Sequence, residues 1–483
     1  MASMKTRIST YYRLGRTQPT VDFVDVDIQG DTRVFIDPRA LRLIPSEWGS
    51  RCVSLVQSFF RSVLTAIRAK DDHMGQRLLG CLHEPNETHL GLSKGSARGR
   101  ALGPRLARDV WKALRDSEAA KRGLLEDLED ITLMIEGISN DIISDITTNI
   151  IRQSLIEYTQ AMCSYYGIPM ESEVDSGPIW DSNSQAWRNA LIPLPVTSYG
   201  KLLLVPKAIV RRRMEYDDQE YYRDYILPYL VEQELSANTE LVRLLRDGRR
   251  KVTKKDVKAK YGAGKEMVLR QTLQHPNILT DYRLVKRQHP RKPLSHVDLA
   301  DSEIGGEEPL WNDLLKAVVD LPVGADSASD YEDKIEQLLT ALFYPTLTNP
   351  IVQHEIHGGR KRIDITYTNL AVEGFFRWVA QHYTAPHIFV ECKNYGKEVG
   401  NPELDQLSGR FSPSRGRVGL LVCRSFTNKK LFLKRCHDTA RDDRGFVIAL
   451  DDSDLKEHVT ARQRDDRRLS FAYLKARFDQ LIM

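Results

Sequence analysis

The chain has 483 residues, which is more than one hydrophobic core usually serves, so the sequence predicts two to four domains. Hydrophobic residues make up 41% of the chain and charged residues 28%, a composition that excludes a largely disordered or fibrous protein. The formal net charge is only +4, so the overall charge gives little reason to invoke an anionic partner.

The cysteines and the apolar segments indicate the cellular compartment of the protein. Six cysteines are scattered without CxxC pairs, which predicts neither a disulfide framework nor a structural zinc site. The first twenty residues lack the apolar core of a signal peptide, and no stretch of about 18 uncharged apolar residues follows. We therefore expect a cytoplasmic protein without a membrane partner.

Residues 1–240 are predicted to be a mostly helical regulatory or recognition region. It opens with alternating apolar and polar residues on both sides of Gly30 and Asp31, the pattern of a β-hairpin. Apolar residues then recur at helical spacing over 51–68 and 124–165. These helices are expected to pack in a common core.

Residues 241–305 are predicted to be a basic, nucleic-acid-binding segment and linker. Sixteen Lys or Arg lie between Arg243 and Lys292 against four acids, so the local charge is strongly positive. Such a run can be no more than a solvated helical face, but its length and single sign favour contact with a phosphate backbone. The side chains expected to bind nucleic acid are Arg249, Arg250, Lys251, Lys254, Lys255 and Lys258.

Residues 306–460 are predicted to form an α/β domain, followed by a helical tail over 461–483. The apolar runs after Tyr331 are short and are bounded by turn residues or charges, so each can be assigned to a helix or a strand. A helix precedes a hairpin that turns at Gly358 and Gly359, and a further strand, helix, strand, helix and strand follow. The predicted order is αβββαβαβ.

Two acids and a lysine in this domain have the chemistry of a phosphodiesterase. Hydrolysis of a phosphodiester calls for a cation that neutralises the phosphate and activates water, and hard carboxylate oxygens hold such a cation. Asp364 and Glu391 can supply these oxygens. Because side chains alternate along a strand, Glu391 and Lys393 share one face, so the ammonium can act on water or on the developing charge.

These residues resemble the PD-(D/E)XK restriction-endonuclease superfamily. Asp364 matches the motif aspartate, Glu391-Cys392-Lys393 matches the (D/E)XK half, and the αβββαβ core with a mixed sheet matches the element order. Glu336 and Gln406 fall where the family often carries a helix glutamate and a helix glutamine. Ile363 stands where the motif name has proline, at a position that contacts no metal.

The resemblance implies a Mg²⁺-dependent or Mn²⁺-dependent endonuclease, with DNA as the preferred substrate. It implies that Asp364, Glu391 and the backbone carbonyl of Cys392 hold the metal, that Lys393 orients or activates water, and that Glu336 and Gln406 support them. A regulatory region joined to such a domain looks like bacterial restriction and anti-phage proteins. The resemblance to the PD-(D/E)XK superfamily covers only about residues 327–455, and it names no family for the rest of the chain.

Several alternatives stay open at this stage. The same fold can grip nucleic acid without catalysis, as an idle component of a defence assembly. The enzyme can also cut RNA, or stay silent until an N-terminal sensor meets a phage component or a nucleotide. A homodimer and other defence-system proteins are further partners to consider, since one active site cuts one strand at a time.

Overall fold

A computed structural model of the chain describes residues 6–91, 104–302, 308–396, 398–464 and 471–483. The described residues form two large hydrophobic cores. The first takes its buried side chains from Ile8 to Leu299 together with Tyr344, and the second takes them from Trp311 to Leu481. The predicted boundary at 305/306 falls in a stretch that lies outside the described residues. No helix in the described part of the chain is long and apolar enough to cross a membrane.

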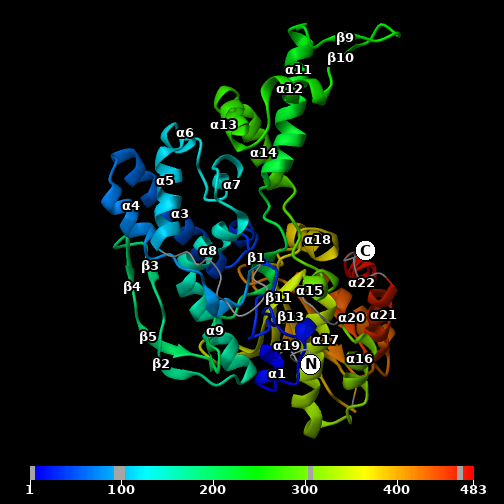
Figure 1. The fold of residues 1–483 in the computed structure, drawn as a ribbon. Coiled ribbons are helices and arrows are strands. Elements are labelled where there is room, and N and C mark those ends of the chain that lie inside the picture. The colour runs from blue at the N-terminus through cyan, green and yellow to red at the C-terminus, as the bar shows by residue number, and fades with distance from the viewer. Residues whose placement is uncertain (1–5, 92–103, 303–307, 397, 465–470) are drawn as a thin grey trace, which may run out of the picture.

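The N-terminal region is mostly helical, with short two-stranded ribbons at its edge (Figure 1). Its helices are α1 (Ile8–Tyr11), α2 (Pro38–Leu41), α3 (Glu47–Ala69), α4 (Asp72–Leu79), α5 (Pro104–Asp116), α6 (Glu118–Lys121), α7 (Asp130–Met134), α8 (Asn140–Ile150) and α9 (Arg152–Tyr166). Its strands are β1 (Phe35–Ile36), β2 (Glu171–Asp175), β3 (Ile179–Asp181), β4 (Ala186–Arg188), β5 (Leu191–Leu194), β6 (Val196–Thr197), β7 (Gly200–Lys201) and β8 (Val210–Arg211).

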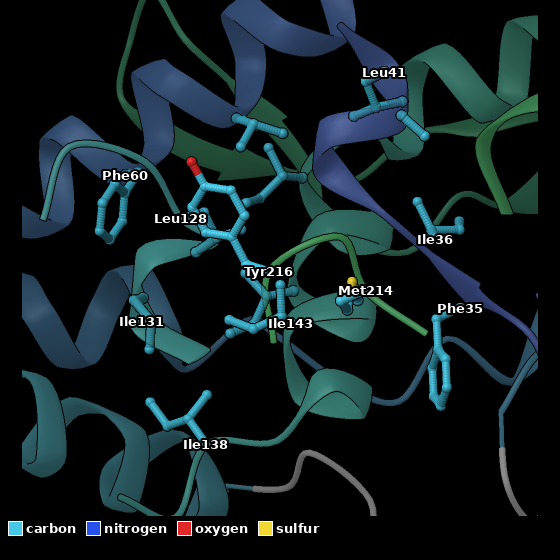
Figure 2. Packing of buried hydrophobic residues seen from close by; sticks show 14 of the residues in the cluster. Phe35, Ile36, Leu41, Phe60, Leu128, Ile131, Ile138, Ile143, Met214 and Tyr216 are labelled. Carbon is cyan, nitrogen blue, oxygen red and sulfur yellow. The ribbon is translucent and has the colours of Figure 1, made fainter. Parts of the chain in front are cut away.

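The core of this region brings the predicted helices together. Helix α3 contains the predicted helix 51–68, and its buried face packs against α8. Figure 2 shows side chains from α3, α7, α8 and a later loop gathered at one place. Among them are Phe60, Ile131, Ile143, Met214 and Tyr216.

The hairpin predicted at the start of the chain is wrong. Strand β1 pairs with β8, far away in the sequence, and not with the residues before Gly30. The segment 21–26 is buried at every position, and Val24 donates its amide hydrogen to Val205 O at 2.9 Å. An alternating sequence predicts a hairpin with one solvent-exposed face. Here Asp22 and Asp25, which alternate with the valines, are also buried and hydrogen-bonded.

Residues 218–288 form an arm that extends from the body to a hairpin at its far end (Figure 1). Its elements are α10 (Asp218–Tyr221), a π-helical turn (Tyr222–Ile226), α11 (Leu227–Ser236), β9 (Arg243–Leu244), β10 (Arg250–Lys251), α12 (Lys254–Tyr261), α13 (Lys265–Gln274) and α14 (Pro276–Gln288). The predicted basic segment therefore does not stand alone, because α11 packs on α12 and both add side chains to the first core.

The C-terminal region is a mixed five-stranded sheet with helices on both faces. After α15 (His296–Ser302), the elements are α16 (Trp311–Val319), α17 (Ala328–Phe343), β11 (Leu347–Ile356), β12 (Lys361–Asn369), α18 (Gly374–His382), β13 (His387–Lys393), α19 (Asn401–Ser408), β14 (Val418–Cys423), α20 (Lys429–Arg441), β15 (Phe446–Leu450), α21 (Asp452–Arg464) and α22 (Ala472–Ile482).

The sheet has the order β11-β12-β13-β14-β15. Strands β11, β12 and β13 are antiparallel, and β13, β14 and β15 are parallel, as the crossover helices α19 and α20 require. Helices α16, α17 and α21 contact one another and form one helical layer. The second layer contains α18, α19, α20 and α22, in which α22 contacts α18 and α20, and α20 contacts α19. The predicted order is thus present, with α18 added. The predicted tail contributes α22, which packs on β15 with Leu474 and Phe478 buried.

Candidate active site

Strands β12 and β13 bring Asp364 and Glu391 to the same place. The two strands pair in antiparallel register up to Ile365 and Val390. One step further along this register sets Asp364 opposite Glu391, and residues directly opposite in an antiparallel pair point to the same face. The two carboxylates, far apart in the sequence, therefore meet at the end of the ladder.

Hydrogen bonds fix the two carboxylates and the lysine. The amide N of Cys392 donates to Asp364 Oδ2 at 2.7 Å, so the aspartate side chain is tied to the neighbouring strand. Lys393 Nζ donates to Glu391 Oε1 at 2.7 Å and to Gln406 Oε1 at 3.4 Å. Gln406 Nε2 also donates to Glu391 Oε1, which closes a ring of three side chains.

Burial makes this cluster electrostatically unusual. Glu391 is completely buried, and Asp364 and Lys393 are both less than one tenth exposed. Burial, reinforced by the nearby negative charge of Asp364, raises the pKa of Glu391 to about 7. Burial also raises the pKa of Asp364, although the amide of Cys392 opposes the change. Burial lowers the pKa of Lys393, but the charge of Glu391 outweighs it and the net shift is upward.

One carboxylate oxygen in the cluster is unsatisfied. Glu391 Oε2 is buried and has no hydrogen-bond partner in the described part of the chain. A buried acceptor without a partner is costly, and a cation shared with Asp364 would satisfy it. The residues present therefore fit a hard divalent cation.

The donor set that fits is small. Among the described residues, no group of three or more His, Cys, Asp or Glu side chains is placed to hold a metal. Two carboxylates and the carbonyl of Cys392 are fewer protein ligands than Ca²⁺ takes, but Mg²⁺ commonly keeps several waters and binds through one or two carboxylates. Carboxylate and carbonyl oxygens are ligands that Mg²⁺ and Mn²⁺ accept.

The structure does not bring Glu336 to this cluster. Glu336 Oε2 accepts a hydrogen bond from Arg16 Nη1 at 2.5 Å, and its Oε1 accepts one from Thr340 Oγ1 at 2.7 Å. Its side chain is fully buried, and burial raises its pKa in spite of Arg16. Both carboxylate oxygens are thus used in contacts away from Asp364 and Glu391.

Glu332, one helical turn earlier in α17, is the helix glutamate near the cluster. Burial and the negative charge of Asp364 raise its pKa, while Lys393 lowers it. Gln353 Nε2 on β11 donates to Glu332 Oε2 at 2.7 Å. Sequence reasoning missed this residue because positions four apart lie on the same helix face, so the spacing alone does not choose between them.

The predicted nucleic-acid-binding residues all lie on the arm and are exposed. Arg249 and Arg250 belong to the β9–β10 hairpin, and Arg249 Nη2 forms an ion pair with Asp247 at 2.6 Å. Lys251, Lys255 and Lys258 have no ion-pair partner within the described ranges, and Lys254 Nζ donates to Arg223 O at 3.1 Å. Most of these six side chains therefore form no ion pair with the described residues.

Aromatic rings of the arm near these charges take part in contacts within the fold. Tyr282 is completely buried and takes part in the core at the base of the arm. Tyr261 OH donates to Glu234 Oε1, and Tyr229 OH lies 3.1 Å from His275 Nδ1. These aromatic residues hold the arm together.

Comparison with known proteins adds one finding. Residues 13–217 match the model of a family described as a domain of unknown function, DUF8370. No curated protein and no solved structure matches the chain. The matched segment contains Arg16 and ends where the arm begins, so it includes neither the arm nor the cluster around Asp364 and Glu391.

Proposed function

We propose that this protein is a metal-dependent nuclease that hydrolyses phosphodiester bonds of DNA. The observation that carries the proposal is the buried meeting of Asp364 and Glu391, with Lys393 bonded to Glu391 and one oxygen of Glu391 unpartnered. Groups with such mutually perturbed charges, gathered at the end of a sheet, are typical of catalytic sites.

The fold supports the same proposal. The mixed sheet and its αβββαβ order agree with the arrangement that the PD-(D/E)XK resemblance implies. In that arrangement the motif aspartate and the (D/E)XK strand are neighbours, as β12 and β13 are here. Glu332 takes the part of the helix glutamate that the sequence had given to Glu336.

Mg²⁺ or Mn²⁺ would be held by Asp364, Glu391 and the carbonyl of Cys392. Such an ion neutralises charge on the phosphate and lowers the pKa of bound water. Lys393 stays protonated because its pKa is raised, so it acts as a hydrogen-bond donor and a positive charge. It is suited to orienting or activating the attacking water, or to stabilising the charge that develops on the phosphate.

Gln406 and Glu332 position the reacting groups. Gln406 bonds both Lys393 and Glu391, so it fixes the distance between ammonium and carboxylate. The charge of Glu332 interacts with Asp364 and Lys393, and its carboxylate accepts a hydrogen bond from Gln353. Residues of this kind, which orient those that touch the metal or substrate, commonly control activity strongly.

The biological role we assign is defence of a bacterial cell against phage or foreign DNA, in the cytoplasm. This role is what the resemblance to bacterial restriction and anti-phage proteins implies. Cleavage products are expected to carry 5′-phosphates, as the resemblance implies. A restraining role for the N-terminal region is supported by the ion pair between Arg16 and Glu336, on the helix that also carries Glu332.

The test is incubation of the purified protein with supercoiled plasmid, linear DNA and RNA, each with Mg²⁺, Mn²⁺ or EDTA. Nicking or linearisation of DNA that requires the metal supports the proposal. Cleavage of RNA and not of DNA would make RNA the substrate, while the proposed metal-dependent phosphodiester hydrolysis would stand. If all substrates survive, phage challenge of cells producing wild-type or Asp364→Ala protein decides, since equal protection by both would establish a binding role without catalysis.

A further inference from the structure

The arm of residues 218–288 carries the β9–β10 hairpin at its far end (Figure 1), and its base packs on the body. Its base is a cluster of tyrosines from α10, the π-helical turn and α14, in which Tyr282 lies 5.0 Å from both Tyr221 and Tyr225 between ring centroids. Tyr216, at the edge of the body, packs on the same ring at 5.1 Å. The arm is thus anchored to the first core, and its tip projects away from it (Figure 1).

The tip is a two-stranded ribbon with a closed turn. Lys251 pairs with Arg243 and Arg250 pairs with Leu244, while Leu245 N donates to Arg249 O at 2.9 Å. Gly248 has φ +80°, a conformation that glycine adopts without strain and that lets the chain reverse.

The ribbon has the dimensions of a groove reader. At about 3.3 Å per residue, the stretch from Arg243 to Asp247 reaches roughly 15 Å. The major groove of B-form DNA is about 12 Å wide and about 8.5 Å deep, and it admits a two-stranded ribbon. The ribbon can therefore reach the base edges without the body of the protein touching the duplex.

The side chains of the ribbon are mostly basic, with two exposed leucines, Leu244 and Leu245, among them. Residues 243–251 carry five Arg or Lys and a single acid, and every residue in this range is exposed. Leu244 is 75% exposed and shares a face with Arg250, its partner across the ribbon. Contact with phosphates alone gives no reason for an exposed leucine, whereas the floor of a groove offers thymine methyl groups.

We infer that the β9–β10 ribbon enters a groove of double-stranded DNA. Arg246, Arg250 and Lys251 bind the phosphates that line the groove, and Leu244 packs against base edges within it. The inference rests on the proposed function in taking nucleic acid as the ligand, and it adds that the duplex is the form recognised. Binding is a separate property from hydrolysis and can be measured without it.

The test measures binding of a short fluorescent duplex, and of one of its strands, to full-length protein carrying Asp364→Ala, in EDTA. We expect the duplex to bind more tightly than the strand. The additional changes Arg246→Ala, Arg250→Ala and Lys251→Ala should weaken duplex binding about 10-fold to 100-fold. They should also reduce the slope of log affinity against log salt by about 2 to 3, because three phosphate contacts are lost.

A matched control removes three exposed positive charges from the body through Arg61→Ala, Arg68→Ala and Lys112→Ala. This variant should change the affinity for the duplex less than about 3-fold, because salt screens long-range attraction. Leu244→Ala should weaken duplex binding several-fold and leave the salt slope unchanged. Equal losses in the arm and body variants, or a strand bound as tightly as the duplex, would overturn the inference. Duplex binding by a wild type that cleaves nothing would contradict the proposed hydrolysis alone.

Discussion

Arg16 of the N-terminal region forms a buried ion pair with Glu336 of helix α17. Arg16 Nη1 lies 2.5 Å from Glu336 Oε2, and its Nη2 lies 2.7 Å from Asp333 Oδ1. The guanidinium also lies over the ring of Tyr166, 5.1 Å from its centroid. The segment matched by the family model is therefore fastened to the helix that begins next to the candidate active site.

Replacing Arg16 tests how strongly this contact holds the two regions together. Arg16→Met leaves Glu336 buried without its cation and should lower the free energy of unfolding by about 3 kcal/mol, as measured in urea. The control is Arg51→Met, which removes an ion pair with Glu157 whose partners are each more than one third exposed. That change should cost less than about 1 kcal/mol. Similar losses in the two variants would show that the buried pair has no special role.

The two glutamates of α17 should separate activity from stability. Glu332→Gln removes a carboxylate charge that interacts with Asp364 and should slow plasmid cleavage about 10-fold, with little change in unfolding. Glu336→Gln should lower stability and leave the cleavage rate per folded molecule unchanged, since its contacts are with Arg16 and Thr340. The reverse outcome would return the catalytic role to Glu336.

The sequence predicted the C-terminal sheet well, because its elements are short and the chain punctuates them clearly. The turn at Gly358 and Gly359 appears as expected, with both residues at positive φ, and the two carboxylates meet. The prediction chose Glu336, which lies one helical turn after Glu332 on the same face of α17. Only the position of Arg16, more than 300 residues away, shows which glutamate is already paired.

Gln406 provides a test of the ring of side chains around Glu391. In Gln406→Ala, Lys393 and Glu391 lose a shared partner, so the ammonium should be less well placed. We expect kcat to fall about 10-fold with KM nearly unchanged, because Gln406 acts through these groups and not through substrate binding. A rise in KM alone would indicate that Gln406 touches the nucleic acid.

The N-terminal region was harder to predict, and the first hairpin shows why. Valines alternating with aspartates are typical of a half-exposed strand. Here Asp22 and Asp25 are buried, because Tyr158 OH and Ser9 Oγ donate hydrogen bonds to them from distant elements. Local alternation cannot reveal partners of that kind, so the pattern was interpreted as a solvent-facing surface.

Acid should destabilise the C-terminal region through His458. Burial lowers the pKa of this histidine from 6.5 to about 4 in the folded protein, and its Nε2 has no partner in the described part of the chain. The unfolded state therefore binds the proton first, and stability falls as the pH drops from 6.5 towards 4. Between pH 7.5 and pH 5 the wild type should lose about 2 kcal/mol more than His458→Leu in urea unfolding. Parallel losses would show that other groups control the acid response.

The central claim is that Asp364, Glu391 and Lys393 form a metal-dependent phosphodiesterase site. The most direct measurement is the rate of supercoiled plasmid cleavage with Mn²⁺ by the wild type, Asp364→Asn and Lys393→Met, with Mn²⁺ binding measured by calorimetry on the same samples. We predict that both variants cleave about 100-fold more slowly or worse, and that only Asp364→Asn also loses Mn²⁺ binding. Cleavage that persists in EDTA, or at the wild-type rate in both variants, would contradict the claim.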